Sequence, residues 1–253
     1  MRIKITFLVP ECRIPINYNY FLSSFIYSKI ASQNEHFASF LHKFGYGKRF
    51  KFFTFSQLFF EHKEVEGTCI HVFPGKGWWF IASPLVDFVR YLFSALMENP
   101  IVRLGSSEFI VQKVEVEKRL PDLEEYQFVM ISPLVLSVPE DKYGKLVHTY
   151  LTPEDERFYE VFKKNLVRKY EIFYGETPKG DIEIIPDWDY IHSKGKITKR
   201  IKIKNSFVRA VVFPFKVKGT KKLIEIGYEA GFGEKNSMGF GMVALKGGST
   251  GER

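Results

Sequence analysis

The sequence is poor in cysteine and has no long apolar run. Cys12 and Cys69 are its only cysteines, too few for a disulfide framework or a cysteine-ligated zinc site, and typical of a reducing cytoplasm. The nearest approach to the ~18 apolar residues that suggest a membrane helix is the stretch 78–97, which a proline and two charged residues interrupt. The N-terminus alternates like a strand and does not resemble a signal peptide. We therefore expect a cytoplasmic protein with no membrane partner.

Sequence patterns for cofactors and metals are also lacking. A dinucleotide-binding loop needs Gly-x-Gly-x-x-Gly between a strand and a helix, and a Walker loop needs Gly-Lys-Ser/Thr; the chain matches neither. No group of histidines and carboxylates has convincing metal spacing, and the closest, Asp187-Trp188-Asp189, is predicted as a turn. We expect no cofactor and no bound metal.

Acidic residues are absent from 190–224, in a chain whose formal net charge is +8. The same stretch holds eleven lysines and arginines, so the rest of the chain carries a net charge of −3. One sign of charge gathered on a folded domain is typical of a polyanion site, although a solubilising surface has the same pattern. We predict a basic hairpin with strands 197–204 and 207–218, whose affinity for a polyanion falls steeply with salt.

Apolar residues, by contrast, are plentiful: 45% are hydrophobic and 17% aromatic, enough for a full core in one or two domains. Over residues 1–120 the periodicity predicts the order β, α (split in two), β, β, α, β of a ferredoxin-like domain. A linker at 121–125 precedes a second such round at 126–246, which starts with a strand at 127–138 and is followed by a flexible tail at 247–253. The predicted fold class is α+β, with tandem ferredoxin-like (RRM-like) domains whose antiparallel sheets carry helices on one face.

The most distinctive motif is the glycine-rich segment, residues 227–243. It contains Gly-Phe-Gly twice, with Lys235, Asn236 and Ser237 between the two copies. A helix-like run precedes the segment, and a strand-like run follows it. Glycines let a backbone lie close to a ligand and aim N–H groups at an anion, although an isolated Gly-x-Gly is equally compatible with a tight turn. The doubled motif with its basic, polar centre favours a loop that contacts a ligand.

Two predicted helices near the N-terminus present polar side chains away from their apolar stripes. At ~100° per residue, Tyr27 lies opposite the apolar side of the helix 18–31, and His42 points away from the stripe of the next helix. Neither side chain is then needed for packing. A histidine at a helix end also interacts favourably with the helix dipole, so His42 alone does not identify a reaction site.

The order helix, glycine loop and strand, at the end of two ferredoxin-like units, resembles the CRISPR repeat-processing endoribonucleases. These form the sixth numbered Cas family, within the repeat-associated RNA-binding superfamily. The resemblance covers nearly the whole chain, and its most specific part is 227–243. It implies that a tyrosine, a histidine and a lysine act on RNA, and the matching residues are Tyr27, His42 and Lys51. Lys48 is an alternative to Lys51, because spacing does not choose between the two lysines.

The activity that the resemblance implies is metal-independent cleavage of CRISPR precursor RNA within its repeats. The 2′-OH of RNA is the nucleophile, so the protein must move protons and stabilise negative charge, tasks that suit a histidine and a lysine. The products would carry a 2′,3′-cyclic phosphate and a 5′-OH. The alternative is a non-catalytic subunit of the same superfamily that holds repeat RNA without cutting it.

The expected partners are the CRISPR repeat RNA and a CRISPR effector complex that receives the product, and a homodimer is left open. Phosphates of the RNA would be contacted by basic residues, its unpaired bases would stack on aromatic side chains, and the glycine-rich segment would lie against it. The predicted RNA-binding residues are Arg2, Lys4, Lys48, Arg200, Lys202, Lys204, Arg209, Gly231, Gly233, Lys235, Asn236, Ser237, Gly239 and Gly241.

Overall fold

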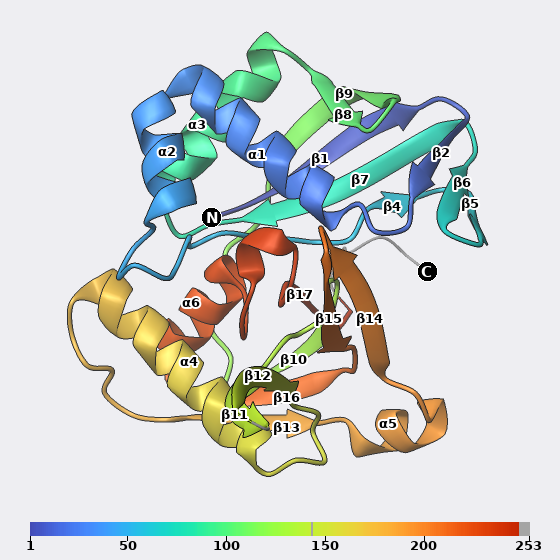
Figure 1. The fold of residues 1–253 in the computed structure, drawn as a ribbon. Helices are drawn as coiled ribbons and strands as arrows, with labels where there is room; N and C mark the ends of the chain where they lie inside the picture. Colours follow the sequence, from blue (N-terminus) through green and yellow to red (C-terminus); the bar gives the residue numbers. More distant parts are fainter. Residues whose placement is uncertain (143, 248–253) are drawn as a thin grey trace.

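A computed structural model describes residues 1–142 and 144–247. Of the predicted tail 247–253, only Gly247 is among the described residues. The chain forms two α+β halves, one from the N-terminal and one from the C-terminal part of the sequence, each with an antiparallel sheet and helices packed against it (Figure 1). No helix within the described residues has both the length and the apolar character needed to cross a membrane.

The first half is built on a sheet with strand order β3-β7-β1-β9-β8, in which β4 also pairs with β7. Alternate residues of β1 point toward the helices, where Ile3, Ile5 and Phe7 are buried. The elements of this half are β1 (Arg2–Val9), α1 (Asn19–Gln33), α2 (Glu35–Lys43), β3 (Thr54–Phe55), β4 (Phe59–Phe60), β7 (Gly75–Ala82), α3 (Val86–Glu98), β8 (Ile101–Leu104) and β9 (Ser107–Val116). A separate three-stranded sheet consists of β2 (Cys12–Pro15), β5 (Lys63–Glu66) and β6 (Cys69–Val72).

The second half repeats the plan with strand order β13-β16-β10-β17. Taken in chain order, the four central strands of each half are arranged 4-1-3-2, as in a ferredoxin-like domain, so the predicted fold class is confirmed. The elements of this half's sheet and helices are β10 (Glu125–Met130), α4 (Arg157–Tyr174), β13 (Ile182–Pro186), α5 (Trp188–Lys194), β16 (Phe215–Gly219), α6 (Lys221–Ala230), the short 3₁₀ helix η1 (Asn236–Met238) and β17 (Val243–Leu245).

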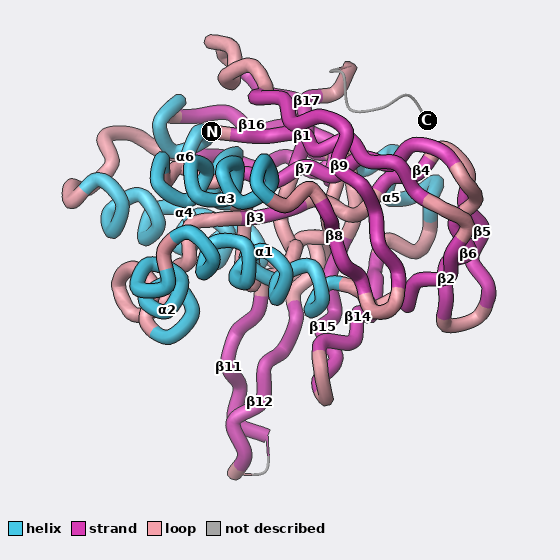
Figure 2. The backbone as a smooth tube through the Cα atoms, turned by 90° about the horizontal axis from the view of Figure 1, so that it is seen from above, coloured by secondary structure: helices cyan, strands magenta, loops and turns pink. Residues whose placement is uncertain are grey.

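Two hairpins, β11–β12 and β14–β15, are inserted into the second half and project from it (Figure 2). Their strands are β11 (Ser137–Lys142), β12 (Lys145–Tyr150), β14 (Thr198–Ile203) and β15 (Ser206–Val211). Two strand predictions are therefore wrong in extent. The strand predicted at 127–138 ends at Met130, and the one predicted at 207–218 is divided into β15 and β16. Pro214, which lacks an N–H for a sheet ladder, lies in that break.

The turn predicted at 187–189 is instead the start of a helix. Asp187 is the N-cap of α5, and its side-chain oxygen accepts a hydrogen bond of 3.0 Å from the Tyr190 N–H. An aspartate in this position satisfies one of the free amides of a first helical turn. Of the residues that gave the nearest approach to metal-ligand spacing, Asp187 thus caps a helix and Asp189 lies in its first turn.

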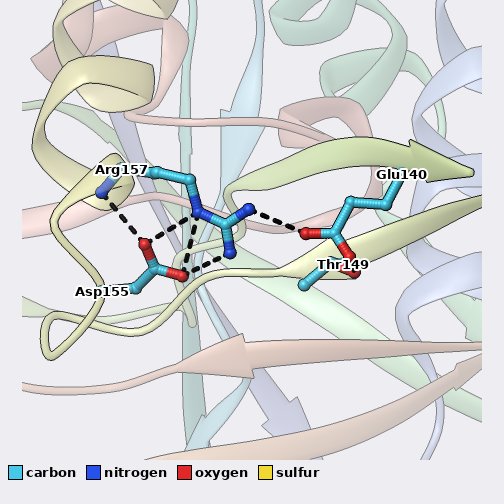
Figure 3. A network of polar contacts seen from close by, with 4 residues as sticks. All are labelled: Glu140, Thr149, Asp155 and Arg157. Atoms are coloured by element: carbon cyan, nitrogen blue, oxygen red, sulfur yellow. Dashed lines mark hydrogen bonds and ion pairs between the residues drawn. The ribbon is translucent and has the colours of Figure 1, made fainter.

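A cluster of charges ties the hairpin β11–β12 to the start of α4 (Figure 3). The Arg157 guanidinium donates to Glu140 of β11 at 2.7 Å and to Asp155 at 2.7 Å. Glu140 also accepts a hydrogen bond from the Thr149 hydroxyl across the hairpin. Bonds to these two carboxylates raise the pKa of Arg157. The middle of a projecting hairpin is therefore tied to the start of α4.

Side chains from the two halves pack together where the halves meet. Phe50 and Phe52, which precede β3, are buried in the core of the second half. A further cluster joins Phe80 and Ala82 of β7 to Met242 at the C-terminal side. The predicted division at 121–125 remains a prediction, and Glu125 already belongs to β10.

Candidate active site and nucleic-acid interface

Tyr27 and His42 lie together, on neighbouring helices of the first half. Tyr27 is in the middle of α1, and His42 is in the last turn of α2, where its imidazole is exposed. The two rings meet edge to face, with their centroids 5.1 Å apart. The short connection between α1 and α2 folds the second helix back along the first, which is why side chains 15 positions apart meet.

The Tyr27 side chain is more closely packed than the helical pattern indicates. Its ring also packs edge to face on Phe53, with centroids 5.6 Å apart, and it borders the core of the first half. The expectation that Tyr27 is not needed for packing is therefore wrong, because the segment after α2 covers that side of α1. Burial raises the pKa of Tyr27 to about 12, and a hydrogen bond with Ser237 opposes part of this rise. The phenol remains protonated at neutral pH and touches the glycine-rich segment.

Lys51 lies beside the same pair. Its Nζ donates a hydrogen bond of 3.0 Å to the backbone carbonyl of His42, and burial lowers the pKa of this lysine. Lys48 is exposed at a backbone φ of +55°. Within the described residues no hydrogen bond or ion pair links Lys48 to His42. The structure thus brings Lys51, and not Lys48, into contact with the histidine residue.

The glycine-rich segment folds back on itself. The Phe232 N–H donates to the Gly241 carbonyl at 2.8 Å, and the Asn236 amide nitrogen donates to the carbonyls of Phe232 and Phe240. Phe232 and Phe240 are fully buried, each contributing roughly 1.5–3 kcal/mol of hydrophobic stabilisation. The two Gly-Phe-Gly motifs therefore hold the two ends of one closed loop.

This closure corrects the role expected for the glycines. Gly231, Gly233, Gly239 and Gly241 are all buried, and the last two donate their N–H groups to carbonyls within the protein. They allow a compact loop rather than an open cradle of amides. The Asn236 side chain is also bonded within the loop, but it is only partly buried and its contact with RNA stays a prediction. The residues at the centre of the segment that keep accessible surface are Glu234, Lys235, Asn236, Ser237 and Met238.

A buried lysine of α4 holds the loop by hydrogen bonds. Lys169 is 1% exposed, and its Nζ donates to the Gly231 carbonyl at 2.6 Å, the Gly233 carbonyl at 2.7 Å and Asn236 Oδ1 at 2.8 Å. An ammonium has three N–H donors, and all three are used. Burial lowers the pKa of Lys169 to about 7, with Glu234 nearby opposing the fall. A neutral amine could serve only two of the three acceptors.

The hairpin β14–β15 carries the exposed part of the basic run. Ile201 and Val208 on its inner face pack with Phe240 of the glycine-rich segment, so its cations face outward. The Lys202 N–H donates to Asn17 at 2.9 Å, which joins the hairpin to the first half. The predicted contacts Arg200, Lys202, Lys204 and Arg209 are all exposed, and they form no ion pair within the described part of the chain.

The last part of the basic run, from β16 onward, does not extend this surface. Lys216 and Lys218 on β16 form ion pairs with Glu125, and Lys221 forms one with Asp122. The prediction of one patch over 190–224 is therefore too broad. The acids that neutralise these lysines are Glu125, at the start of β10, and Asp122 just before it, and sequence spacing does not predict that they lie beside β16.

Arg2 and Lys4 lie on β1, on the sheet face opposite the helices. Arg2 is 3% exposed, with its guanidinium carbon 3.8 Å from the centroid of the Tyr228 ring and one nitrogen bonded to the Tyr228 carbonyl. This burial contradicts a phosphate contact at Arg2. Lys4 is only partly buried and lies 5.9 Å from the rings of Trp78 and Phe80, and its RNA contact stays a prediction.

Sequence reasoning missed the lysine beneath the loop, although a signal was present. Phe158, Phe162 and Leu166 form the buried stripe of α4, and Lys169 comes three residues later on the same stripe. A lysine in that register must either leave the core or find several acceptors. No pattern in the sequence says that the acceptors lie more than 60 residues away.

Both halves of the chain match known protein families. Residues 13–115 match the family "CRISPR-associated protein Cas6, N-terminal", and residues 115–245 match "CRISPR associated protein Cas6, C-terminal". The chain is 38% identical over 232 residues to "CRISPR-associated endoribonuclease Cas6 1" of Methanocaldococcus jannaschii, covering 91% of this chain and 86% of the relative. It is 32% identical over 251 residues to "CRISPR-associated endoribonuclease Cas6" of Pyrococcus furiosus, covering 96% and 89% respectively.

One similar solved structure is titled "An RAMP protein binding different RNA substrates". It superposes with a TM-score of 0.83 at 28% identity, and the match covers 97% of this chain and 99% of that one.

Replacing Gly241 tests the closure of the loop. A Cβ at this position would lie 1.8 Å from the Phe232 carbonyl oxygen, at a φ of +76°. We expect Gly241→Ala to lower the free energy of unfolding by at least about 2–3 kcal/mol, because steric overlap adds to backbone strain. Gly247→Ala is the matched control, since its φ is +80° but no atom lies within 4 Å. Equal losses in urea unfolding of the two variants would contradict this role.

Titration of Lys169 is expected to appear in stability. The folded chain releases this proton near pH 7, whereas the unfolded chain keeps it to about 10.5. Between these two pH values the unfolded chain holds one more proton than the folded chain, so the free energy of unfolding rises with pH, by up to about 1.4 kcal/mol per pH unit. This gain in stability is lost as the pH is lowered again toward 7. Lys169→Met lacks this rise. Urea unfolding at several pH values measures it, with the exposed Lys164→Met as control; parallel pH curves for wild type and Lys169→Met would refute it.

Proposed function

The chain belongs to the Cas6 family of CRISPR-associated endoribonucleases, and we propose that it cuts precursor CRISPR RNA within its repeats. The observation that carries this proposal is that Tyr27 and Lys51 both contact His42, and that Tyr27 also bonds Ser237 of the glycine-rich segment. A general acid–base group, a cation and a neutral phenol meet at one exposed position.

The proposed reaction uses the RNA as its own nucleophile. A base removes the proton of a 2′-OH, the 2′ oxygen forms a bond to the adjacent phosphorus, and the bond from phosphorus to the 5′ oxygen breaks as that oxygen gains a proton. The products are a 2′,3′-cyclic phosphate and a 5′-OH, and neither water nor a metal ion enters the balance. Proton transfer is assigned to His42, because imidazole exchanges protons near neutrality.

Lys51 and Tyr27 support the same step in different ways. The ammonium of Lys51 is assigned the role of stabilising the negative charge that grows on the phosphate oxygens, and its bond to the His42 carbonyl supports this assignment. The phenol of Tyr27, kept protonated by its burial, orients the imidazole through ring contact and can donate a hydrogen bond to the substrate. Both residues therefore act on substrate bound at the exposed imidazole of His42.

Binding is assigned to the surface beside this site. Exposed Arg200, Lys202, Lys204 and Arg209 contact phosphates, and Lys235 extends this charge onto the glycine-rich segment. Arg200 also lies over the Phe207 ring, with its guanidinium carbon 3.7 Å from the ring centroid, and the exposed Phe207 is suited to stack on an unpaired base. Transfer of the product to an effector complex, and a homodimer, stay predictions.

Substitution of His42 tests the chemistry. We expect His42→Ala to lower the cleavage rate of a labelled repeat RNA by about 10²–10⁴-fold in EDTA, while the affinity for the RNA changes little. His36→Ala, a second exposed histidine on α2, should cleave normally. Unchanged cleavage by His42→Ala would move the site elsewhere, activity restored only by magnesium would refute the metal-independent step, and binding without cutting by wild type would favour the non-catalytic alternative.

The two candidate lysines are separated by paired variants. We expect Lys51→Ala to lower the single-turnover cleavage rate by about 10²–10³-fold, as loss of a transition-state charge contact does. Lys48→Gly removes the other charge and suits a φ of +55°, so its rate should fall less than about fivefold. The reverse ranking, with both variants folded by circular dichroism, would assign the cation to Lys48.

A further inference from the structure

A cavity of about 320 Å³ adjoins the proposed active site on the side of the second half. Its walls come from the segment 49–53, from α4, from the hairpin β11–β12 and from the glycine-rich segment. Two of its lining residues are shared with the active site. Lys51 touches the His42 carbonyl, and Ser237 bonds Tyr27. A strand of RNA that passes over His42 therefore meets the mouth of this cavity.

The charges around the cavity favour an anion. Arg49, Lys51 and Lys235 line it, and so does the buried Lys169. The single carboxylate in the lining is Glu234, and both of its oxygens are occupied: one accepts from the Ser137 hydroxyl at 2.9 Å and the other from the Ser137 N–H at 3.4 Å. The cavity thus has an excess of positive charge with its one acid already bonded.

Two further polar groups line the cavity, the Asn165 amide and the His148 imidazole. Asn165 lies one turn before Lys169 on α4, and its side-chain oxygen is buried with no hydrogen-bond partner in the described part of the chain. A buried, unpaired amide oxygen costs about 1–3 kcal/mol, so it is suited to a ligand that brings a donor.

His148 forms the opposite wall, from the hairpin β11–β12. Its imidazole is exposed except for a contact of 3.2 Å between Nδ1 and the Ser137 hydroxyl. The cluster of Glu140, Asp155 and Arg157 ties the strand opposite His148 to the start of α4 (Figure 3), which limits the movement of His148 relative to α4. An exposed imidazole is one of the surfaces on which unstacked RNA bases lie.

We propose that this cavity is a subsite for one unpaired ribonucleotide next to the cleaved phosphate, with Asn165 and His148 recognising its base. The inference rests on the proposed function for its substrate. Its volume is at the lower end of small-molecule pockets, which suits a single nucleotide and excludes a duplex. The phosphate faces Arg49 and Lys51, the base stacks on His148, and Asn165 accepts from a base or ribose donor. Asn165 and His148 are binding residues and do not take part in the proton transfers.

An abasic scan of the repeat tests the subsite. The RNA is the repeat encoded with the protein, carrying a 2′-deoxy nucleotide at the mapped cut so that it binds without being cleaved. One base is removed at a time, and the dissociation constant is measured at fixed salt. For wild type we expect a loss of about tenfold or more at one position next to the cut, in the range found for a stacked base, and smaller losses elsewhere.

The variants then connect that position to the cavity. Asn165→Leu and His148→Ala should each weaken binding of the intact repeat about three- to tenfold, and removal of the critical base should then cost them little further affinity. Lys164→Ala is the control on α4, because it is exposed and bonded only to Glu160, and it should keep the wild-type profile. Melting temperatures check that each variant is folded. If Asn165→Leu unfolds, His148→Ala still tests the subsite, because His148 is exposed.

Two results would overturn the inference: variants that retain the full abasic penalty at every position, or variants that lose affinity equally at all positions. Its failure is distinct from failure of the proposed function. If wild type cuts no repeat, the unmodified RNA is used for the same scan, and a coupled position still supports the subsite. If wild type cuts but no position couples to Asn165 or His148, the endoribonuclease assignment stands and the subsite is rejected.

Discussion

The three hydrogen bonds from Lys169 to the glycine-rich segment are the interaction on which the site depends. One ammonium holds two backbone carbonyls and the Asn236 amide, and Asn236 in turn holds the carbonyls on either side of it. Replacing Lys169 by an apolar side chain would leave three buried acceptors without this donor, which costs more than the bonds themselves contribute. The loop is rigid because a helix of the second half supplies the donor that its own backbone lacks.

This rigid loop also carries the contacts between the halves. Ser237 bonds Tyr27 of α1, the Asn19 amide donates to the Met238 carbonyl at 2.8 Å, and the Thr54 hydroxyl donates to the Phe240 carbonyl at 3.0 Å. The proposed catalytic residues belong to the first half, but their surroundings are completed by a segment more than 180 residues later. Phe50 and Phe52 extend the same connection in the other direction. The site is thus a property of the packed pair of halves.

Local pattern predicted the parts of this arrangement that depend on local physics. The tandem fold followed from the order of periodic runs, and the stretches around Tyr27, His42 and Lys51 from residue types at helix positions and from the family resemblance. What the pattern did not contain was long-range pairing. Gly239 and Gly241 are required by contacts with Phe55 and Phe232, the lysines of β16 are neutralised by Glu125 and Asp122, and Lys169 is satisfied only by a loop more than 60 residues away. Each miss concerns a partner that sequence spacing does not specify.

The two kinds of positive charge in this protein should act on RNA differently. The cations of β14–β15 are exposed, so salt screens them and they contribute a long-range attraction that falls with ionic strength. The Lys169 ammonium is buried and bonded to neutral acceptors, with Glu234 as a nearby but separately bonded acid. Mobile ions have no access to it, so its field at the loop is little screened. The attraction of RNA to the protein is then separate from the placement of RNA over His42. The hairpin β14–β15 supplies the attraction, and the buried Lys169 supports the placement by holding the glycine-rich segment.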